Sequence, residues 1–212
     1  MYKPLTEDDK ISDVAIVTSG VFQDGASSIT TFHTSSTQYT NTGDYNVDVY
    51  RYDPGTNTSA SVQFGVAYGH AEGSASLGLP GTAGDRTTAA VFGQFNNMIN
   101  PPQTQRFKFS GLTDVKQVYA LTFNRARIRE SLEPGGWEIH INDGAHTVKL
   151  IDDSSTNVGG NTDQRNFSPE YNIVSGTLIN GTTVNTTATG EGSTIGSYGL
   201  FYPSLGTLIF NP

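Results

Sequence analysis

Short stretches in which apolar and polar residues alternate recur along the chain, and they predict β-strands. In residues 45–50, for example, Tyr45, Val47 and Val49 alternate with polar neighbours. Such a period of two places every second side chain on one face of a half-buried sheet. The strands predicted in this way, together with short apolar runs, span residues 14–17, 45–50, 61–68, 107–109, 115–123 and 173–179.

Two hairpins are also predicted. Residues 137–141 alternate, Asn142-Asp143-Gly144 supplies a turn, and residues 148–152 run back. The chain ends on a second hairpin, residues 200–210, in which residues 203–206 form the turn.

One amphipathic helix is predicted at about residues 87–99. Asp85 or Thr87 can cap its start, and Asn100 before Pro101 ends it. Its apolar positions fall at helical spacing, at Val91, Phe92, Phe95, Met98 and Ile99. We expect this face to pack on the sheet that carries Tyr119, Leu121, Phe123, Trp137, Ile139 and Ile141.

Long loops rich in Gly, Ser and Thr separate these elements, at residues 24–44, 71–84 and 180–197. No clean linker divides the chain into two cores. The fold expected is therefore mainly β: a single antiparallel β-sandwich-like domain over residues 14–212, with one packing helix and an N-terminal arm at residues 1–13.

Composition and charge limit the partners. Only 35% of residues are hydrophobic and 15% are charged, and the formal net charge is −8 with a pI near 4.8. The one dense basic run is Arg125, Arg127 and Arg129, which suits a solvated face or a row of ion pairs between subunits better than a phosphate site. Nucleic acid is not expected to be a main partner.

The compartment follows from what the chain lacks. It has no cysteine, so disulfides and thiol catalysis are excluded. It also has no signal-peptide pattern and no apolar run of the ~20 residues that span a membrane. We expect the protein to be made and folded in a cytoplasm, with no membrane partner.

No constellation typical of catalysis, cofactor binding or metal binding stands out. His140 and His146 flank a hairpin turn, but no third ligand lies near them in the sequence. Asp152 and Asp153 are neighbours in a predicted strand, where adjacent side chains point to opposite faces. We expect no catalytic residue, no cofactor and no metal site, although a single calcium ion in a loop stays open.

The arm at residues 1–13 has few apolar groups with which to anchor itself. We expect it to dock on another subunit through anchors at its start, with acidic residues at the rim of the contact. The interface residues expected on this basis, together with the basic run, are Tyr2, Pro4, Leu5, Glu7, Asp8, Asp9, Arg125, Arg127 and Arg129.

Four stretches resemble, in the same order, a known family. They are YKPLTEDDK (2–10), FGQFNNMIN (92–100), FNRARIRESLEPGGWEIHIN (123–142) and YGLFYPSLGTLIF (198–210). The chain is similar in these phrases to virion structural proteins of contractile-tailed bacteriophages, those infecting cyanobacteria in particular. The resemblance implies a place in the virion, whether neck, tail or baseplate, and it carries over no catalytic residues.

The function expected is that of a non-catalytic structural subunit of a tailed-phage virion, made in the host cytoplasm. Its partners would be copies of itself, in a symmetric ring or sheath, and other virion proteins. The alternative is a carbohydrate-binding module of a tail fibre or host-surface protein, since exposed aromatic residues can stack on sugars. The only tryptophan, Trp137, points toward the core by strand alternation, which weakens that alternative.

Overall fold

The computed structural model describes residues 17–18, 20–35, 46–73, 88–100, 107–109, 115–142, 147–157, 160, 169–179, 182–185 and 198–211. Within these residues the protein is mainly β and contains one α-helix, α1 (Thr88–Ile99), as the sequence predicts. The helix agrees with its expected span to within a residue. None of the helices in the described residues is long and apolar enough to cross a membrane.

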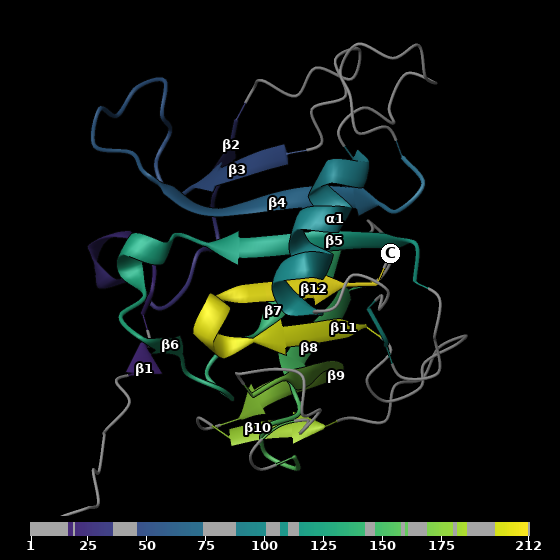
Figure 1. Cartoon of the computed structure of the whole chain (residues 1–212). Coiled ribbons are helices and arrows are strands. Elements are labelled where there is room, and N and C mark those ends of the chain that lie inside the picture. The colour runs from purple at the N-terminus through teal and green to yellow at the C-terminus, as the bar shows by residue number, and fades with distance from the viewer. Residues whose placement is uncertain are drawn as a thin grey trace, which may run out of the picture.

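A single antiparallel sheet dominates the fold (Figure 1). Nine strands form one path, and β10 (Thr182–Asn185) pairs with β9 beside it. The order along the path is β2 (His33–Thr34), β3 (Asn46–Tyr50), β4 (Val62–His70), β5 (Gln117–Phe123), β12 (Thr207–Phe210), β11 (Gly199–Tyr202), β9 (Tyr171–Ile179), β8 (Thr147–Asp152) and β7 (Ile139–Asn142).

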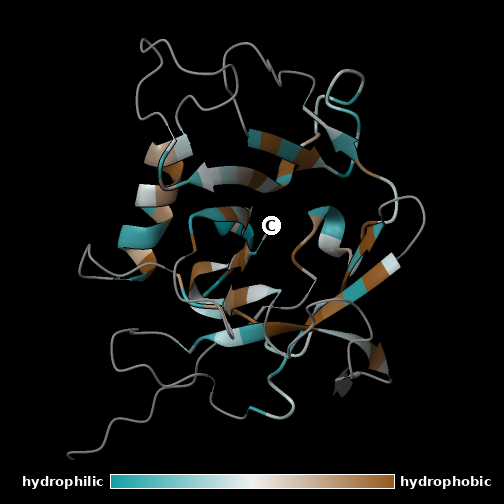
Figure 2. Cartoon of the chain, turned by 90° about the vertical axis from the view of Figure 1, so that its right-hand side faces the viewer, coloured by the Kyte–Doolittle hydropathy of each residue, from teal (hydrophilic) through white to brown (hydrophobic). Residues whose placement is uncertain are grey.

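The sheet curls into a half-barrel, and α1 lies outside the curve (Figure 2). A separate pair of short parallel strands, β1 (Val17–Thr18) and β6 (Ser131–Leu132), lies beside it. Three short 3-10 helices complete the described elements: η2 (Gln23–Gly25), η3 (Arg125–Arg127) and η4 (Pro203–Leu205). The two facing sheets of a sandwich are not confirmed, because one sheet bends around its own concave face.

Strand alternation divides the apolar side chains between two cores, one on each face of the sheet. In β5, Val118 and Ala120 face α1, whereas Leu121 faces the concave side. The helix-side core consists of Phe92, Ile99, Phe107, Phe109, Val115, Val118, Ala120, Leu200, Tyr202 and Ile209. The inner core consists of Leu121, Ile128, Leu132, Leu150, Tyr171, Ile173, Phe201 and Leu208.

The predicted contact between the helix and the sheet is therefore wrong, because α1 packs on the other face of the sheet. Phe92 and Ile99 are buried, but they pack on the helix-side core. The positions expected beneath the helix lie on the other face: Leu121 belongs to the inner core, Phe123, Trp137 and Ile139 pack against that core, and Tyr119 and Ile141 are largely exposed. A period of two shows which residues share a face, but it does not show which face a helix covers.

The hairpin of β11 and β12 occupies the middle of the sheet, between β9 and β5. Its turn ends at Gly206, whose φ of 62° is the left-handed conformation that glycine tolerates best. A Cβ at this position would lie 2.2 Å from Cδ1 of Ile128. The turn is thus pressed against the segment that fills the concave face.

The approach of α1 to the sheet depends on Gly69 in β4. A Cβ added there would lie 2.9 Å from both the Cα and the N atoms of Phe92. Such a contact is closer than side-chain carbons normally tolerate, and it meets backbone that cannot rotate away. The absence of a side chain at Gly69 therefore sets the distance between helix and sheet.

We expect Gly69→Ala to destabilise the protein by about 1–3 kcal/mol, the usual cost of overpacking. Gly93→Ala on α1 is the matched control, because its added Cβ meets no atom within 4 Å. That control should be neutral or stabilising by up to about 1 kcal/mol. Urea denaturation measures both free energies of unfolding, and equal values for the two variants would contradict the close approach.

Candidate functional site

The three arginines of the basic run that was predicted as an interface, Arg125, Arg127 and Arg129, lie in different environments in the structure. Asn124 caps η3, because its Oδ1 accepts a hydrogen bond from the N–H of Ala126 at 3.1 Å. Within η3, Arg127 turns toward the body of the protein and donates from Nη2 to Oγ of Ser61 at 2.7 Å. Arg125 and Arg129 are exposed. The three side chains therefore do not form one continuous row, and the contact role of Arg125, Arg127 and Arg129 stays a prediction.

The other expected interface residues, Tyr2, Pro4, Leu5, Glu7, Asp8 and Asp9, lie outside the described residues, as does His146. Their roles stay predictions.

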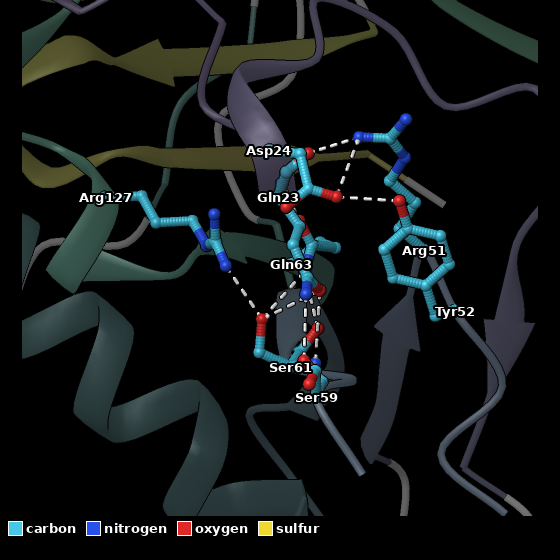
Figure 3. A network of polar contacts seen from close by, with 8 residues as sticks. All are labelled: Gln23, Asp24, Arg51, Tyr52, Ser59, Ser61, Gln63 and Arg127. Carbon is cyan, nitrogen blue, oxygen red and sulfur yellow. Dashed lines mark hydrogen bonds and ion pairs between the residues drawn. The ribbon is translucent and has the colours of Figure 1, made fainter. Parts of the chain in front are cut away.

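An extended polar network joins the segment around η2 to the start of β4 (Figure 3). Its centre is a pair of buried amides, Gln23 and Gln63, which are 9% and 1% exposed. The backbone N–H of Gln23 donates to Oε1 of Gln63 at 2.6 Å, and Nε2 of Gln23 donates to the carbonyl of Ser59 at 2.8 Å. Oε1 of Gln23 accepts from Oγ of Ser61 at 3.1 Å. We call Gln23, Ser61 and Gln63 the glutamine clamp.

A group of three side chains, of which Asp24 is exposed and Arg51 and Tyr52 are half-buried, extends the clamp toward solvent. Asp24 has a φ of 61°, and its Oδ2 accepts a hydrogen bond from the hydroxyl of Tyr52 at 2.7 Å. Arg51 donates from Nη1 to the carbonyl of Gln23, lies 3.8 Å from the Asp24 carboxylate, and stacks over the Tyr52 ring. The hydrogen bond to Asp24 raises the pKa of Tyr52, with a smaller contribution from burial. These contacts fix the chain around residue 24 to the loop between β3 and β4.

Two buried aspartates lie at the end of β8 and just beyond it. Asp152 accepts hydrogen bonds from the N–H groups of Gly135 and Ser154, at 2.8 and 3.0 Å. Asp153 accepts from the backbone N–H and from Nδ2 of Asn172, at 2.9 and 2.7 Å. The neighbours thus bind different partners, as expected of adjacent residues at a strand end. Their oxygens are occupied by the fold, which gives them a role in holding loops.

A third polar cluster lies at β7, on the face opposite the inner core. Glu138 contacts Nε2 of His140, lies 3.8 Å from Nζ of Lys149, and accepts the N–H of Leu178 at 2.6 Å. Burial raises the pKa of Glu138, but the hydrogen bonds from His140 and Leu178 outweigh it and leave this pKa below its usual value. The carboxylate is thus held in its charged form and satisfies a backbone donor of β9.

An aromatic row crosses three strands at one end of the sheet. Tyr119 in β5 lies directly opposite Tyr68 in β4 and Phe210 in β12, so the three side chains share a face. The rings of Tyr68 and Tyr119 are 5.1 Å apart, and Tyr119 is 43% exposed. The next pair on the same face of these two strands is polar, His70 opposite Gln117.

Trp137 packs against the inner core, as its alternation predicts. Its ring meets that of Phe201 edge-on at 5.4 Å. Within the ranges that the structure describes, no three His, Asp or Glu side chains gather closely enough to hold a metal ion.

Over the described residues, these features define the class of protein: an antiparallel β protein with one packing helix, polar clusters that hold loops in place, and a partly exposed aromatic row. Comparison of the chain with models of known families, with curated proteins and with solved structures finds no match.

The loss of one amide from the glutamine clamp should destabilise the protein, because the polar groups of the other amide stay buried. Gln63→Leu keeps the size of the side chain but leaves the backbone N–H and the side-chain oxygen of Gln23 buried with fewer partners. We expect a loss of about 1–3 kcal/mol in the free energy of unfolding, the cost of unsatisfied buried polar groups. The same substitution at the exposed Gln117 should stay within about 0.5 kcal/mol. If urea denaturation gives the two variants the same free energy of unfolding, the hydrogen bonds of the clamp do not contribute to stability.

Proposed function

We propose that this protein is a non-catalytic structural subunit of a tailed-phage virion, in the neck, tail or baseplate. The observation that carries the proposal is where the resembling stretches lie. Residues 92–100 lie in and just beyond α1, residues 123–142 run through η3, β6 and β7, and residues 198–210 contain the β11–β12 hairpin. The stretch at residues 2–10 lies outside the described residues.

These three stretches, far apart in the sequence, meet in space around the central hairpin. On one face of the hairpin, Phe92 and Ile99 of α1 share the helix-side core with Leu200 and Ile209. On the other face, residues 123–142 supply Ile128, Leu132 and Trp137 to the side that holds Phe201 and Leu208. Chance phrases would be expected to scatter over a fold. Phrases that pack together on the two faces of one hairpin support a resemblance that extends to the fold.

The test is the composition of purified particles of the phage that encodes the chain. We expect the protein to band with the virions in a density gradient, in a fixed ratio to the major tail proteins when measured by quantitative mass spectrometry. Gold-labelled antibodies should mark one axial position on the particle. Recovery of the protein only in the soluble fraction of the lysate would overturn the proposal.

A second candidate function, carbohydrate binding, is favoured by one observation. The row of Tyr68, Tyr119 and Phe210 offers aromatic faces for the apolar side of a sugar ring, and His70 and Gln117 beside it offer hydrogen bonds to hydroxyls. Trp137 is not available for this role, because it packs against Phe201.

If the row binds saccharides, a glycan array should give discrete hits, and Tyr119→Ala should abolish them without lowering the melting temperature much. Phe32→Ala is the matched control, because Phe32 is an exposed aromatic residue, 58% accessible, that precedes β2. Equal loss in both variants, or an array without hits, would argue against this candidate.

A further inference from the structure

The nine-strand path of the sheet ends in two edge strands of different character, β2 and β7. An edge strand presents unpaired N–H and C=O groups, and proteins usually blunt such edges with very short strands, bulges or charges. The β2 edge is blunted, because β2 has two residues and the strand behind it, β3, changes register between Val49 and Tyr50. The β7 edge keeps an unbroken register with β8 over four residue pairs.

The β7 edge also carries an apolar side chain in solvent. Ile141 is 48% exposed, on the same face as Ile139 and Val148, which pack against the inner core. No strand in the described part of the chain pairs with the outer side of β7. A backbone edge that lies beside an exposed isoleucine fits a strand from another chain, since such a strand would pair the main chain and cover the side chain.

From this we propose that β7 pairs antiparallel with β7 of a second copy of the chain, around a two-fold axis. The two copies would form a continuous sheet, in which Ile139 and Ile141 of each copy meet those of the other on one face. This inference rests on the proposed function, which gathers many copies in one particle.

Strand direction favours this β7–β7 joint over a head-to-tail joint between β7 of one copy and β2 of the next. Every pairing along the nine-strand path is antiparallel, so the strands alternate in direction and the two edge strands run the same way. Pairing β7 with β2 of the next copy would therefore be parallel if the faces were kept, and only the two residues of β2 would take part. A β7–β7 joint is antiparallel, and two-fold contacts are the commonest between identical subunits.

The charged side chains beside β7 do not oppose the β7–β7 joint. Glu138, next to the edge, is already paired with His140 and Lys149 and bound to the N–H of Leu178. Bringing two copies together therefore buries no unpaired carboxylate at this position. Because β7 has only four residues, the contact covers less surface than the 1,200–2,000 Å² or so of a stable interface. It should be weak in dilute solution and persist where copies are concentrated.

Because the chain has no cysteine, the joint can be tested by cross-linking at introduced single cysteines. His140→Cys, and in a second variant Asn142→Cys, places one thiol on β7. With a bis-maleimide reagent, each variant should give a covalent dimer of the chain, both in particles and in concentrated solution. Gln94→Cys, exposed on α1, is the control that should give none.

Adding Ile141→Lys to the His140→Cys variant should abolish the dimer. Met98→Lys should leave it intact, because Met98 is exposed to a similar extent, 47% against 48%, but lies on the helix. Both lysine variants should keep the melting temperature of the parent protein, which checks that each one folds.

Three outcomes overturn the joint: no cross-link at either β7 position, cross-links only to a different protein, or a dimer that survives Ile141→Lys. If the chain is found in particles and no dimer forms, the joint fails and the proposed function stands. If the chain is absent from particles but dimerises in solution through β7, the proposed function fails and the joint stands.

Discussion

The whole fold depends on burying both faces of the C-terminal hairpin. β11 and β12 lie in the middle of the sheet, although they are the last strands of the chain. One face of the hairpin is covered by α1 and the other by the segment that follows β5. Among the described strands, β5 and β9 flank the hairpin and do not pair with each other, so the hairpin joins the two halves of the sheet. The sheet is complete only when β11 and β12 have inserted between strands that precede them in the sequence, and such non-local pairing slows folding.

The sequence predicts local elements well and their arrangement poorly. The helix, the β7–β8 hairpin and the terminal hairpin all appear where spacing and turn residues place them. Those signals act over a few residues. The face that α1 covers was wrongly predicted because it depends on Gly69, where the missing side chain admits the helix backbone. Nothing in a strand pattern marks that glycine as the contact point.

The polar contacts that hold the loops were missed for a related reason. Gln23 and Gln63 are 40 positions apart in the sequence, and neither stands in a motif. Their burial follows from tertiary contacts, because each amide can be buried only where the other supplies a hydrogen-bond partner. Likewise, Ile141 has the alternation of a core residue. It is exposed because β7 lies at the end of the strand path and, among the described strands, has β8 as its one neighbour. The order of strands in a sheet is a long-range property that alternation does not encode.

A two-fold joint has a consequence for assembly. Two copies that pair through β7 satisfy each other, so this contact alone stops at a dimer. A ring or sheath therefore needs a second, different surface on each subunit. β2 is a poor candidate, since its short strand and the register shift beside it are the means by which proteins block edge pairing. The exposed Arg125 and Arg129 and the expected acidic arm at residues 1–13 remain, and they have opposite charges. A dimer through β7 that is linked to the next by arm and arginines would use one apolar and one electrostatic contact, and only the second would weaken with salt.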